Sequence, residues 1–222
     1  MSIGEEIRDI TASLPEGVRL VAVSKFHPEE AIMEAYKAGQ RVFGESHVQE
    51  LQRKHDALPS DIEWHFIGHL QTNKVKYIVP YVSLIHAVDS PKLLAEISRQ
   101  ATKAGRRVPC LLQLHVAQEE TKFGFSVEEA ESFLASGEWL SLPGIEIRGV
   151  MCMASNVDDE RQIANEFDAA HSFFLHAKER YFTSQASFRE CSWGMSDDYP
   201  IAIGHGSTLV RIGSKIFGQR IY

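Results

Sequence analysis

The sequence predicts a single (β/α)8 barrel, a TIM barrel, and three observations support this fold class. Short apolar runs typical of buried strands alternate with helical patterns along almost the whole chain, and eight such runs can be counted. No stretch rich in Pro, Ser and Gly is long enough to separate two domains. The 222 residues, 44% hydrophobic and 24% charged, suit one domain over residues 1–222. An open doubly wound sheet is the alternative, and the strand count favours closure.

The first repeating unit is the clearest. A short leading helix ends near Pro15 and Gly17, and residues 18–24, VRLVAVS, then form a nearly continuous apolar run. Such a run predicts a strand that is covered on both faces, as in a parallel sheet. Pro28 opens a helical pattern that Gly39 ends, because Pro favours the first turn of a helix and Gly favours its end.

The unit then repeats along the rest of the chain. Further strands are predicted over residues 41–44, 64–68, 84–89, 108–116, 145–151, 189–194 and 207–213. Helical patterns occupy residues 45–58, 71–81, 91–105, 126–139, 158–181 and 196–203. In this barrel the carboxyl ends of the strands line the active site, so polar groups there are functional candidates. Candidates at those ends are Lys25, Ser46, Gly68, Asp89, His115 and residues 151–154, 195–197 and 213–214.

Charge and cysteine content exclude several classes of protein. The net charge of -7 and pI near 5.8 argue against sequence-independent binding of nucleic acid or of an anionic membrane. The three cysteines, Cys110, Cys152 and Cys191, lie far apart among apolar residues, which predicts buried thiols in a reducing compartment. No signal-peptide core and no run of 18 apolar residues is present. We therefore expect a soluble cytoplasmic protein.

Lys25 is the sharpest chemical candidate, because VRLVAVSK places its amine where the first strand enters the mouth of the barrel. Partial loss of hydration at such a position favours the neutral amine, which is the form that reacts with an aldehyde to give a Schiff base. The alternative from this segment alone is a lysine whose ammonium group extends into solvent.

The glycine-rich last third of the chain predicts a site for an anion. Ser196, followed by Asp197 and Asp198, resembles a helix N-cap, and free backbone N–H groups at such a position can hold a phosphate. Gly213 and Ser214 follow the eighth strand, the usual phosphate position in this barrel. Two ordinary turns are the alternative interpretation.

Arg211 lies inside the apolar run STLVRIG, where an unpaired guanidinium would be costly. We therefore expect it to face the barrel mouth or a partner. That partner is either an atom of a cofactor or a neighbouring carboxylate.

Other reaction classes find little support. His65 and His69 have i, i+4 spacing, but Gly68 and the surrounding strand pattern argue against a helical metal pair, and no metal site is predicted. The chain has no G-x-S-x-G elbow, no P-loop lysine motif and no G-x-G-x-x-G after a strand. Asp197 and Asp198 are adjacent, and adjacent carboxylates rarely face one cleft as an acid and base pair for sugar chemistry.

Taken together, several motifs spread over nearly the whole chain resemble one family. They are AVSK at 22–25, FGES-HVQE at 43–50, WHFIGHLQTNK at 64–74, KFG at 122–124, RGVMCMA at 148–154, GMSDD at 194–198 and STLVRIGSKIFG at 207–218. The family is that of the pyridoxal 5′-phosphate (PLP) homeostasis proteins, single-domain relatives of the alanine racemase N-terminal domain. The resemblance implies PLP as the cofactor.

The resemblance also implies a role for individual residues. Lys25, the lysine of AVSK, would carry the Schiff base with PLP. Ser196 of GMSDD, with Gly213 and Ser214, would hold the phosphate, and Arg211 would lie near the pyridine nitrogen. Because an arginine stays protonated and does not protonate that nitrogen, broad carbanion chemistry is disfavoured.

Two positions depart from the family pattern. FGEN of the family is FGES here, so that the shorter hydroxyl of Ser46 replaces an amide and puts one contact at the mouth in doubt. GMSDD is followed by YPIAI instead of a more acidic and alanine-rich stretch, which we expect to alter helix packing only. Neither departure touches Lys25.

The sequence favours a PLP carrier over an enzyme. Racemisation needs two bases, and in alanine racemases the second comes from a further domain and the partner subunit, whereas this sequence runs only to Tyr222. We expect a monomer that buffers PLP or delivers it to apo-enzymes. A PLP-dependent racemase, or another PLP enzyme of this fold, is the alternative. A third class, a metal or sugar-phosphate barrel enzyme without PLP, would be colourless and insensitive to substitution of Lys25.

Overall fold

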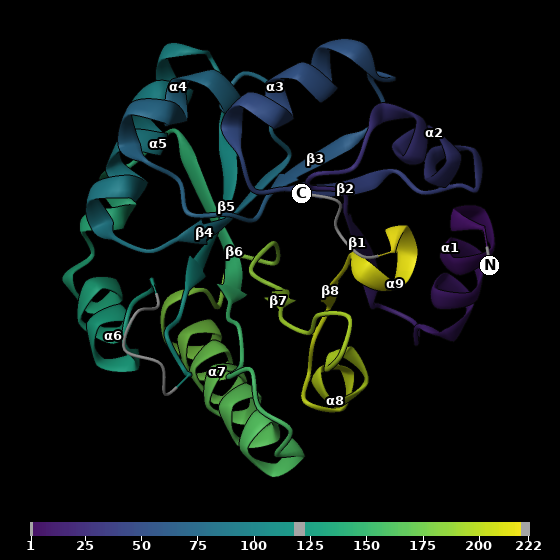
Figure 1. Cartoon of the computed structure of the whole chain (residues 1–222). Coiled ribbons are helices and arrows are strands. Elements are labelled where there is room, and N and C mark those ends of the chain that lie inside the picture. Colours follow the sequence, from purple (N-terminus) through teal and green to yellow (C-terminus); the bar gives the residue numbers. More distant parts are fainter. Residues whose placement is uncertain (1, 118–122, 219–222) are drawn as a thin grey trace.

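Eight parallel strands close into a barrel in the computed structural model, which describes residues 2–117 and 123–218 (Figure 1). β1 pairs with β2 on one side and with β8 on the other, so the sheet has no free edge. The predicted barrel is therefore confirmed, and the doubly wound alternative is wrong. The strands are β1 Arg19–Val23, β2 Val42–Glu45, β3 Glu63–Phe66, β4 Leu84–Val88, β5 Val108–Gln113, β6 Ile145–Met151, β7 Glu190–Ser192 and β8 Leu209–Ile212.

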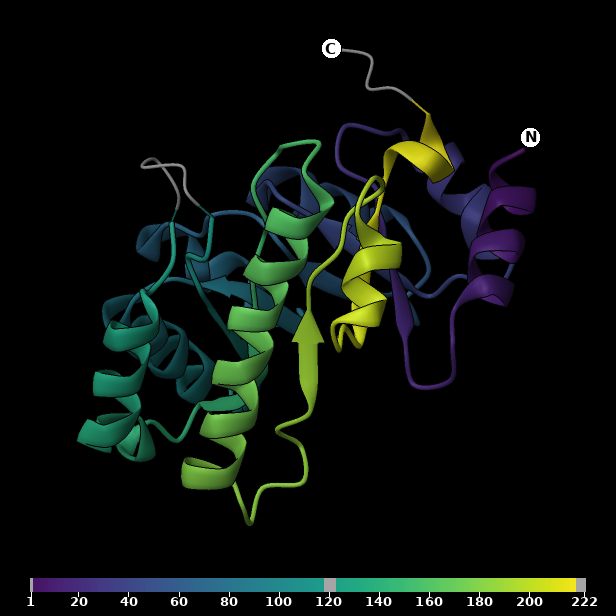
Figure 2. The same ribbon diagram turned by 90° about the horizontal axis from the view of Figure 1, so that it is seen from below.

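Helices follow the strands around the outside of this barrel (Figure 1). The α-helices are α1 Ile3–Ser13, α2 Glu29–Lys37, α3 Val48–Ala57, α4 Val75–Ile78, α5 Pro91–Lys103, α6 Val127–Ser136, α7 Glu160–Tyr181, α8 Tyr199–Gly204 and α9 Ser214–Phe217; the 3-10 turns are η1 Thr72–Lys74 and η2 Glu138–Ser141. Figures 1 and 2 show α9 beside α1, and the two helices are in contact.

Two predicted helices are shorter than the sequence pattern suggests. The pattern over residues 71–81 gives only η1 and the single turn of α4, because Pro80 has no N–H and its ring clashes with the carbonyl of a preceding turn. The pattern over residues 196–203 becomes helical only at Tyr199, because the Asp198 carboxylate accepts a hydrogen bond from the Met195 N–H and closes a turn first.

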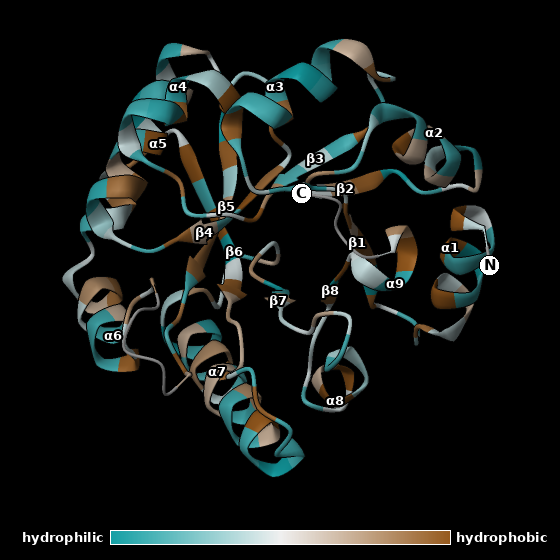
Figure 3. Cartoon of the chain, in the orientation of Figure 1, coloured by the Kyte–Doolittle hydropathy of each residue, from teal (hydrophilic) through white to brown (hydrophobic). Residues whose placement is uncertain are grey.

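Apolar side chains form two layers, one on each face of the sheet. The larger layer lies between the strands and the surrounding helices, where brown strands meet the brown inner faces of helices in Figure 3. The smaller one fills the barrel interior with Val21, Leu84, Leu111, Met151 and Leu209. Burial on both faces explains the continuous apolar run of β1. The three cysteines are buried free thiols, as predicted.

Alternation along the strands determines which residues reach the mouth. In β1, Val21 belongs to the interior layer, so Val23 and then Lys25 continue the same inward series beyond the carboxyl end of the strand. None of the helices within the described parts of the chain has the length and apolar character needed to cross a bilayer.

Candidate functional site at the barrel mouth

A cavity of about 260 Å³ opens at the carboxyl ends of the strands. It brings together the five residues that the sequence predicted as one site, although they come from opposite ends of the chain. The lining residues are Val23, Lys25, Ser46, Ile67, Met153, Met195, Ser196, Asp197, Arg211, Gly213 and Ser214. Because β1 and β8 are neighbours, the first and last strands contribute to one wall of this cavity.

Two turns at this wall present backbone N–H groups. No acceptor within residues 2–117 and 123–218 takes a hydrogen bond from the N–H of Ser196, Asp197 or Ser214. The Ser196 hydroxyl accepts a hydrogen bond from the Gly213 N–H at 3.3 Å, which joins the two turns. Ser196 is not the helix N-cap that the sequence suggested, because Asp198 occupies that position. The turns nevertheless meet at the cavity, with donors suited to an anion.

Arg211 is buried at the base of the cavity. Its guanidinium donates to the Ser192 carbonyl at 2.8 Å, to the Ser192 hydroxyl at 2.6 Å and to the Cys152 carbonyl at 3.0 Å. Burial lowers the pKa of Arg211, and the charge of Asp198 partly offsets this effect. Among the described residues no carboxylate contacts this guanidinium, so of the two partners expected from the sequence the carboxylate is wrong.

A chain of neutral groups continues from Arg211 into the barrel interior. The Ser192 hydroxyl lies 2.8 Å from His86 Nδ1, and His86 Nε2 lies 2.9 Å from His65 Nδ1. Burial lowers the pKa of His65 from 6.5 to about 3, and the pKa of His86 lies well below its ordinary value for the same reason. Both imidazoles are therefore neutral at physiological pH.

The other candidates from the sequence fall elsewhere. His69 is partly exposed and pairs with Asp89 at 2.9 Å, whereas His65 points into the barrel, so the two histidines do not face a common site. Asp197 lines the cavity and Asp198 is buried as a turn acceptor, as expected of adjacent carboxylates. Lys122 of the KFG motif lies outside the described residues.

Sequence reasoning missed a buried charged cluster behind the end of β1, made by Glu45, Glu50 and Lys54. One signal was available. In the predicted helix over residues 45–58, Lys54 follows the apolar Val48 and Leu51 at helical spacing, so its side chain falls on the face that is turned toward the barrel. A charged residue on that face needs a partner, and the helix supplies one in Glu50.

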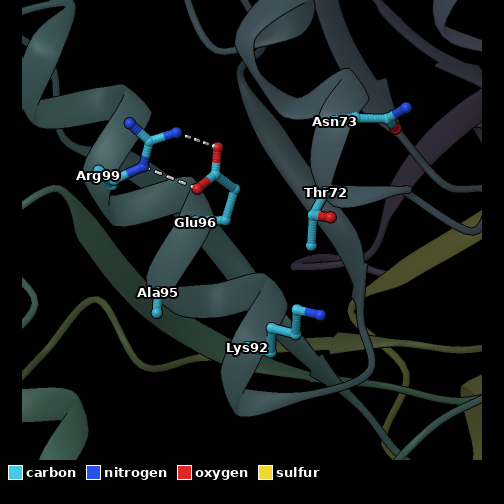
Figure 4. Close-up of a pocket in the computed structure, with 6 residues that line it drawn as sticks. All are labelled: Thr72, Asn73, Lys92, Ala95, Glu96 and Arg99. Carbon is cyan, nitrogen blue, oxygen red and sulfur yellow. Dashed lines mark hydrogen bonds and ion pairs between the residues drawn. The ribbon is translucent and has the colours of Figure 1, made fainter.

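A larger hollow lies on the outside of the barrel between η1 and α5 (Figure 4). It measures about 410 Å³ and is lined by Thr72, Asn73, Lys92, Ala95, Glu96 and Arg99. Two of its charged groups already satisfy each other, because Arg99 donates to both oxygens of Glu96. The mouth cavity is smaller, but its buried Arg211 contacts no carboxylate within the described parts of the chain, so the mouth is the better candidate.

The fold and the site define the class of parallel barrels that carry a lysine after the first strand and backbone N–H donors after the last. Residues 2–221 match the family described as "Alanine racemase, N-terminal domain". A curated relative named "Pyridoxal phosphate homeostasis protein", from Aquifex aeolicus, is 37% identical over 205 residues, which cover 92% of this chain and 88% of the relative. The chain belongs to the pyridoxal phosphate homeostasis protein family, which is built on that domain.

Solved structures agree with this assignment. PipY of Synechococcus elongatus, solved without PLP, superposes with a TM-score of 0.91 at 35% identity and covers 98% of this chain and 100% of PipY. The structure of PipY with PLP bound gives a TM-score of 0.87 at the same identity. The predicted family and the alanine racemase-like fold are therefore confirmed.

Proposed function

We propose that this protein binds PLP at the barrel mouth, holds it as a Schiff base on Lys25, and serves intracellular PLP homeostasis. The observation that carries the proposal is the meeting of three groups at one small cavity: an inward lysine, a cradle of N–H donors and a buried arginine. The relatives named for PLP homeostasis, and PipY solved with PLP bound, support the same cofactor.

The residues present fit this cofactor in charge and in size. The PLP phosphate is an anion, and the N–H groups of Ser196, Asp197 and Ser214 can donate to it together with the Ser196 hydroxyl. The cavity of about 260 Å³ is close to the lower end of ligand sites, about 300 Å³, as expected for a small cofactor. The Asp197 side chain is exposed, so its charge can remain in water.

The remaining groups of the site orient the cofactor. PLP supplies an aldehyde carbon, to which the Lys25 amine nitrogen bonds while the aldehyde oxygen leaves as water. Arg211 would lie at the pyridine nitrogen, held there by Ser192 and by the Cys152 carbonyl. Because Arg211 stays protonated, it would donate a hydrogen bond to that nitrogen without transferring a proton. The pyridine ring would then be a weaker electron sink for a carbanion on the substrate.

This limited electron withdrawal disfavours PLP chemistry that needs a protonated pyridine ring, but it does not separate a carrier from a racemase. The names of the relatives support the carrier. We further propose that the protein is a cytoplasmic monomer and delivers PLP to apo-enzymes. A PLP-dependent racemase is the second candidate. Exchange of the Cα hydrogen of added amino acids for solvent deuterium at useful rates would establish the racemase and overturn the carrier; size-exclusion chromatography with light scattering tests the monomer.

The first test uses the visible absorbance of the protein after PLP is added. We expect Lys25→Ala to abolish the Schiff-base band, and borohydride reduction followed by peptide mass spectrometry to locate PLP on Lys25 in the native protein. Lys92→Ala is the matched control, because Lys92 lies in the outer hollow, and it should keep the full band. An undiminished band in Lys25→Ala would refute the assignment.

A further inference from the structure

A cluster of three charged residues is buried directly behind the end of β1. The Lys54 ammonium, completely buried, lies 2.7 Å from Glu45 Oε1 and 2.7 Å from Glu50 Oε1. The Ser24 hydroxyl also donates to Glu45 Oε1, at 2.6 Å. Burial raises the pKa of Glu45, an effect that Lys54 and Ser24 oppose. The cluster therefore joins α3 to the ends of β1 and β2.

This cluster forms hydrogen bonds with the backbone on both sides of Lys25. The third proton of the Lys54 ammonium is donated to the Ser24 carbonyl at 2.7 Å, just before Lys25. Glu50 Oε1 accepts a hydrogen bond from the Phe26 N–H at 2.7 Å, just after it. One ammonium and one carboxylate, themselves paired, thus hold the two peptide groups that flank the lysine.

These hydrogen bonds lie at a strained turn. Phe26 has a φ of 68°, the only positive φ of a non-glycine residue among the described parts of the chain. This conformation is unfavourable for a residue with a Cβ, so it persists only where surrounding contacts enforce it. The hydrogen bond from the Phe26 N–H to Glu50 is such a contact, and the turn determines the direction in which Lys25 leaves the strand.

Stability alone gives little reason for this arrangement. Buried ion pairs commonly contribute no more to folding than apolar side chains of similar volume, because both charges lose their hydration. Here the three protons of the ammonium reach two carboxylates and one carbonyl, and the shared Glu50 oxygen also binds the turn. We therefore attribute a geometric role to these charges: they fix the backbone conformation on both sides of Lys25.

We propose that Glu50 and Lys54 are positioning residues that aim the Lys25 amine at the PLP aldehyde. The inference rests on the proposed function. Neither residue lines the mouth cavity, so each acts through the backbone at Lys25. The phosphate donors after β7 and β8 do not depend on the cluster, so its loss should leave PLP bound but unlinked.

The test compares two substitutions at one position. Glu50→Ala removes the oxygen that accepts from Phe26 and Lys54, whereas Glu50→Gln keeps an oxygen that can accept from both. We expect the ratio of Schiff base to total bound PLP to fall about tenfold or more in Glu50→Ala, which is the value of one hydrogen bond to a charged group, and to recover in Glu50→Gln. Schiff base is measured by absorbance and borohydride trapping, and total PLP by release in alkali.

Glu29→Ala is the matched control. It removes an ion pair of 3.0 Å between α2 and α3, from Glu29 to Arg53, without touching the turn at Lys25, and should keep the native ratio. Glu50→Met, which fills space without an acceptor, replaces Glu50→Ala if that variant does not fold.

Four results would contradict one of the two proposals. A native ratio in Glu50→Ala, or in Glu50→Met where it replaces that variant, overturns the positioning role, as does a parallel loss of Schiff base and total PLP. A loss in Glu50→Gln as large as in Glu50→Ala overturns it as well. Absence of Schiff base in the unmodified protein instead refutes the proposed function.

Discussion

The arginines at the two ends of the barrel have different partners. At the amino ends of the strands, Arg19 pairs with Glu190 at 2.9 Å, and Arg41 with Asp61 at 3.0 Å. At the carboxyl ends, Arg211 bonds only to uncharged oxygens among the described residues, and several backbone N–H groups have no acceptor there. The arginines at the amino ends thus have carboxylate partners, whereas Arg211 has none among the described residues.

This difference indicates that the mouth is the end suited to a ligand. The arginines at the amino ends are already matched by carboxylates. At the mouth, the N–H groups of Ser196, Asp197 and Ser214 have no acceptor among the described residues, and buried donors are costly unless a partner satisfies them.

The largest effect concerns the histidine layer between the two ends, where charges from both Arg19 and Arg211 act on His86. The pKa of His65 is about 3 in the folded protein and near 6.5 when unfolded, so below pH 6.5 only the unfolded chain gains the proton. Stability should therefore fall as pH falls. We expect a loss of about 2 kcal/mol from His65 between pH 6.5 and about pH 5, and a further loss in the same direction from His86, measured by urea unfolding.

The control for this pH dependence is a pair of substitutions. His65→Gln should reduce the slope of the unfolding free energy against pH, whereas the exposed His176→Gln should leave it unchanged. A flat profile in the unmodified protein between these pH values would show that the buried imidazoles do titrate in the folded state.

The second effect compares one arginine from each end. Arg211→Gln should weaken PLP binding by up to about a hundredfold, because a charge-assisted hydrogen bond contributes about 1.5–3 kcal/mol. Arg19→Gln should leave PLP affinity unchanged and lower stability by about 1 kcal/mol, since that pair is half exposed. Fluorescence titration and urea unfolding measure the two quantities. Equal PLP affinities in the two variants would show that Arg211 contributes no more to PLP binding than Arg19 does.

The smallest effect concerns single hydroxyl groups. Ser196→Ala should lower PLP affinity about tenfold by removing one donor to the phosphate. Thr208→Val is the matched change at the amino end, where the Thr208 hydroxyl contacts Glu190 and the Cys191 backbone. It should lower the midpoint of thermal unfolding and leave PLP affinity at its native value. An unaltered PLP affinity in Ser196→Ala would show that this hydroxyl is not a donor to the phosphate.

The barrel was predictable because strands covered on both faces leave continuous apolar runs, as in residues 18–24. Helix boundaries were less predictable where tertiary contacts compete with periodicity. The start of α8 depends on a hydrogen bond from the Met195 N–H to the Asp198 carboxylate, and the periodicity of apolar residues does not reveal such a bond. The helix after β3 depends on Pro80, which is visible in the sequence but falls inside a favourable pattern.

The residues that line the mouth cavity were predictable, but the contacts that support them were not. Strand ends of a barrel share one face, so the sequence alone is enough to group Lys25, Arg211 and Ser214. The positive φ of Phe26 could not be foreseen, because large aromatic residues normally avoid that conformation. Nor could the pairing of Lys54 with Glu45, which requires the exact packing of α3 on β2.

The pairing of β1 with β8 has a consequence for synthesis on the ribosome. Lys25 emerges with the first strand, but Gly213 and Ser214 follow the last one, so a nascent chain contains the proposed Schiff-base lysine long before the proposed phosphate donors. At the proposed site, PLP would contact both only after the eighth strand joins the first. Cofactor retention would thus report completed translation and closure, and incomplete chains would compete little with finished molecules for PLP.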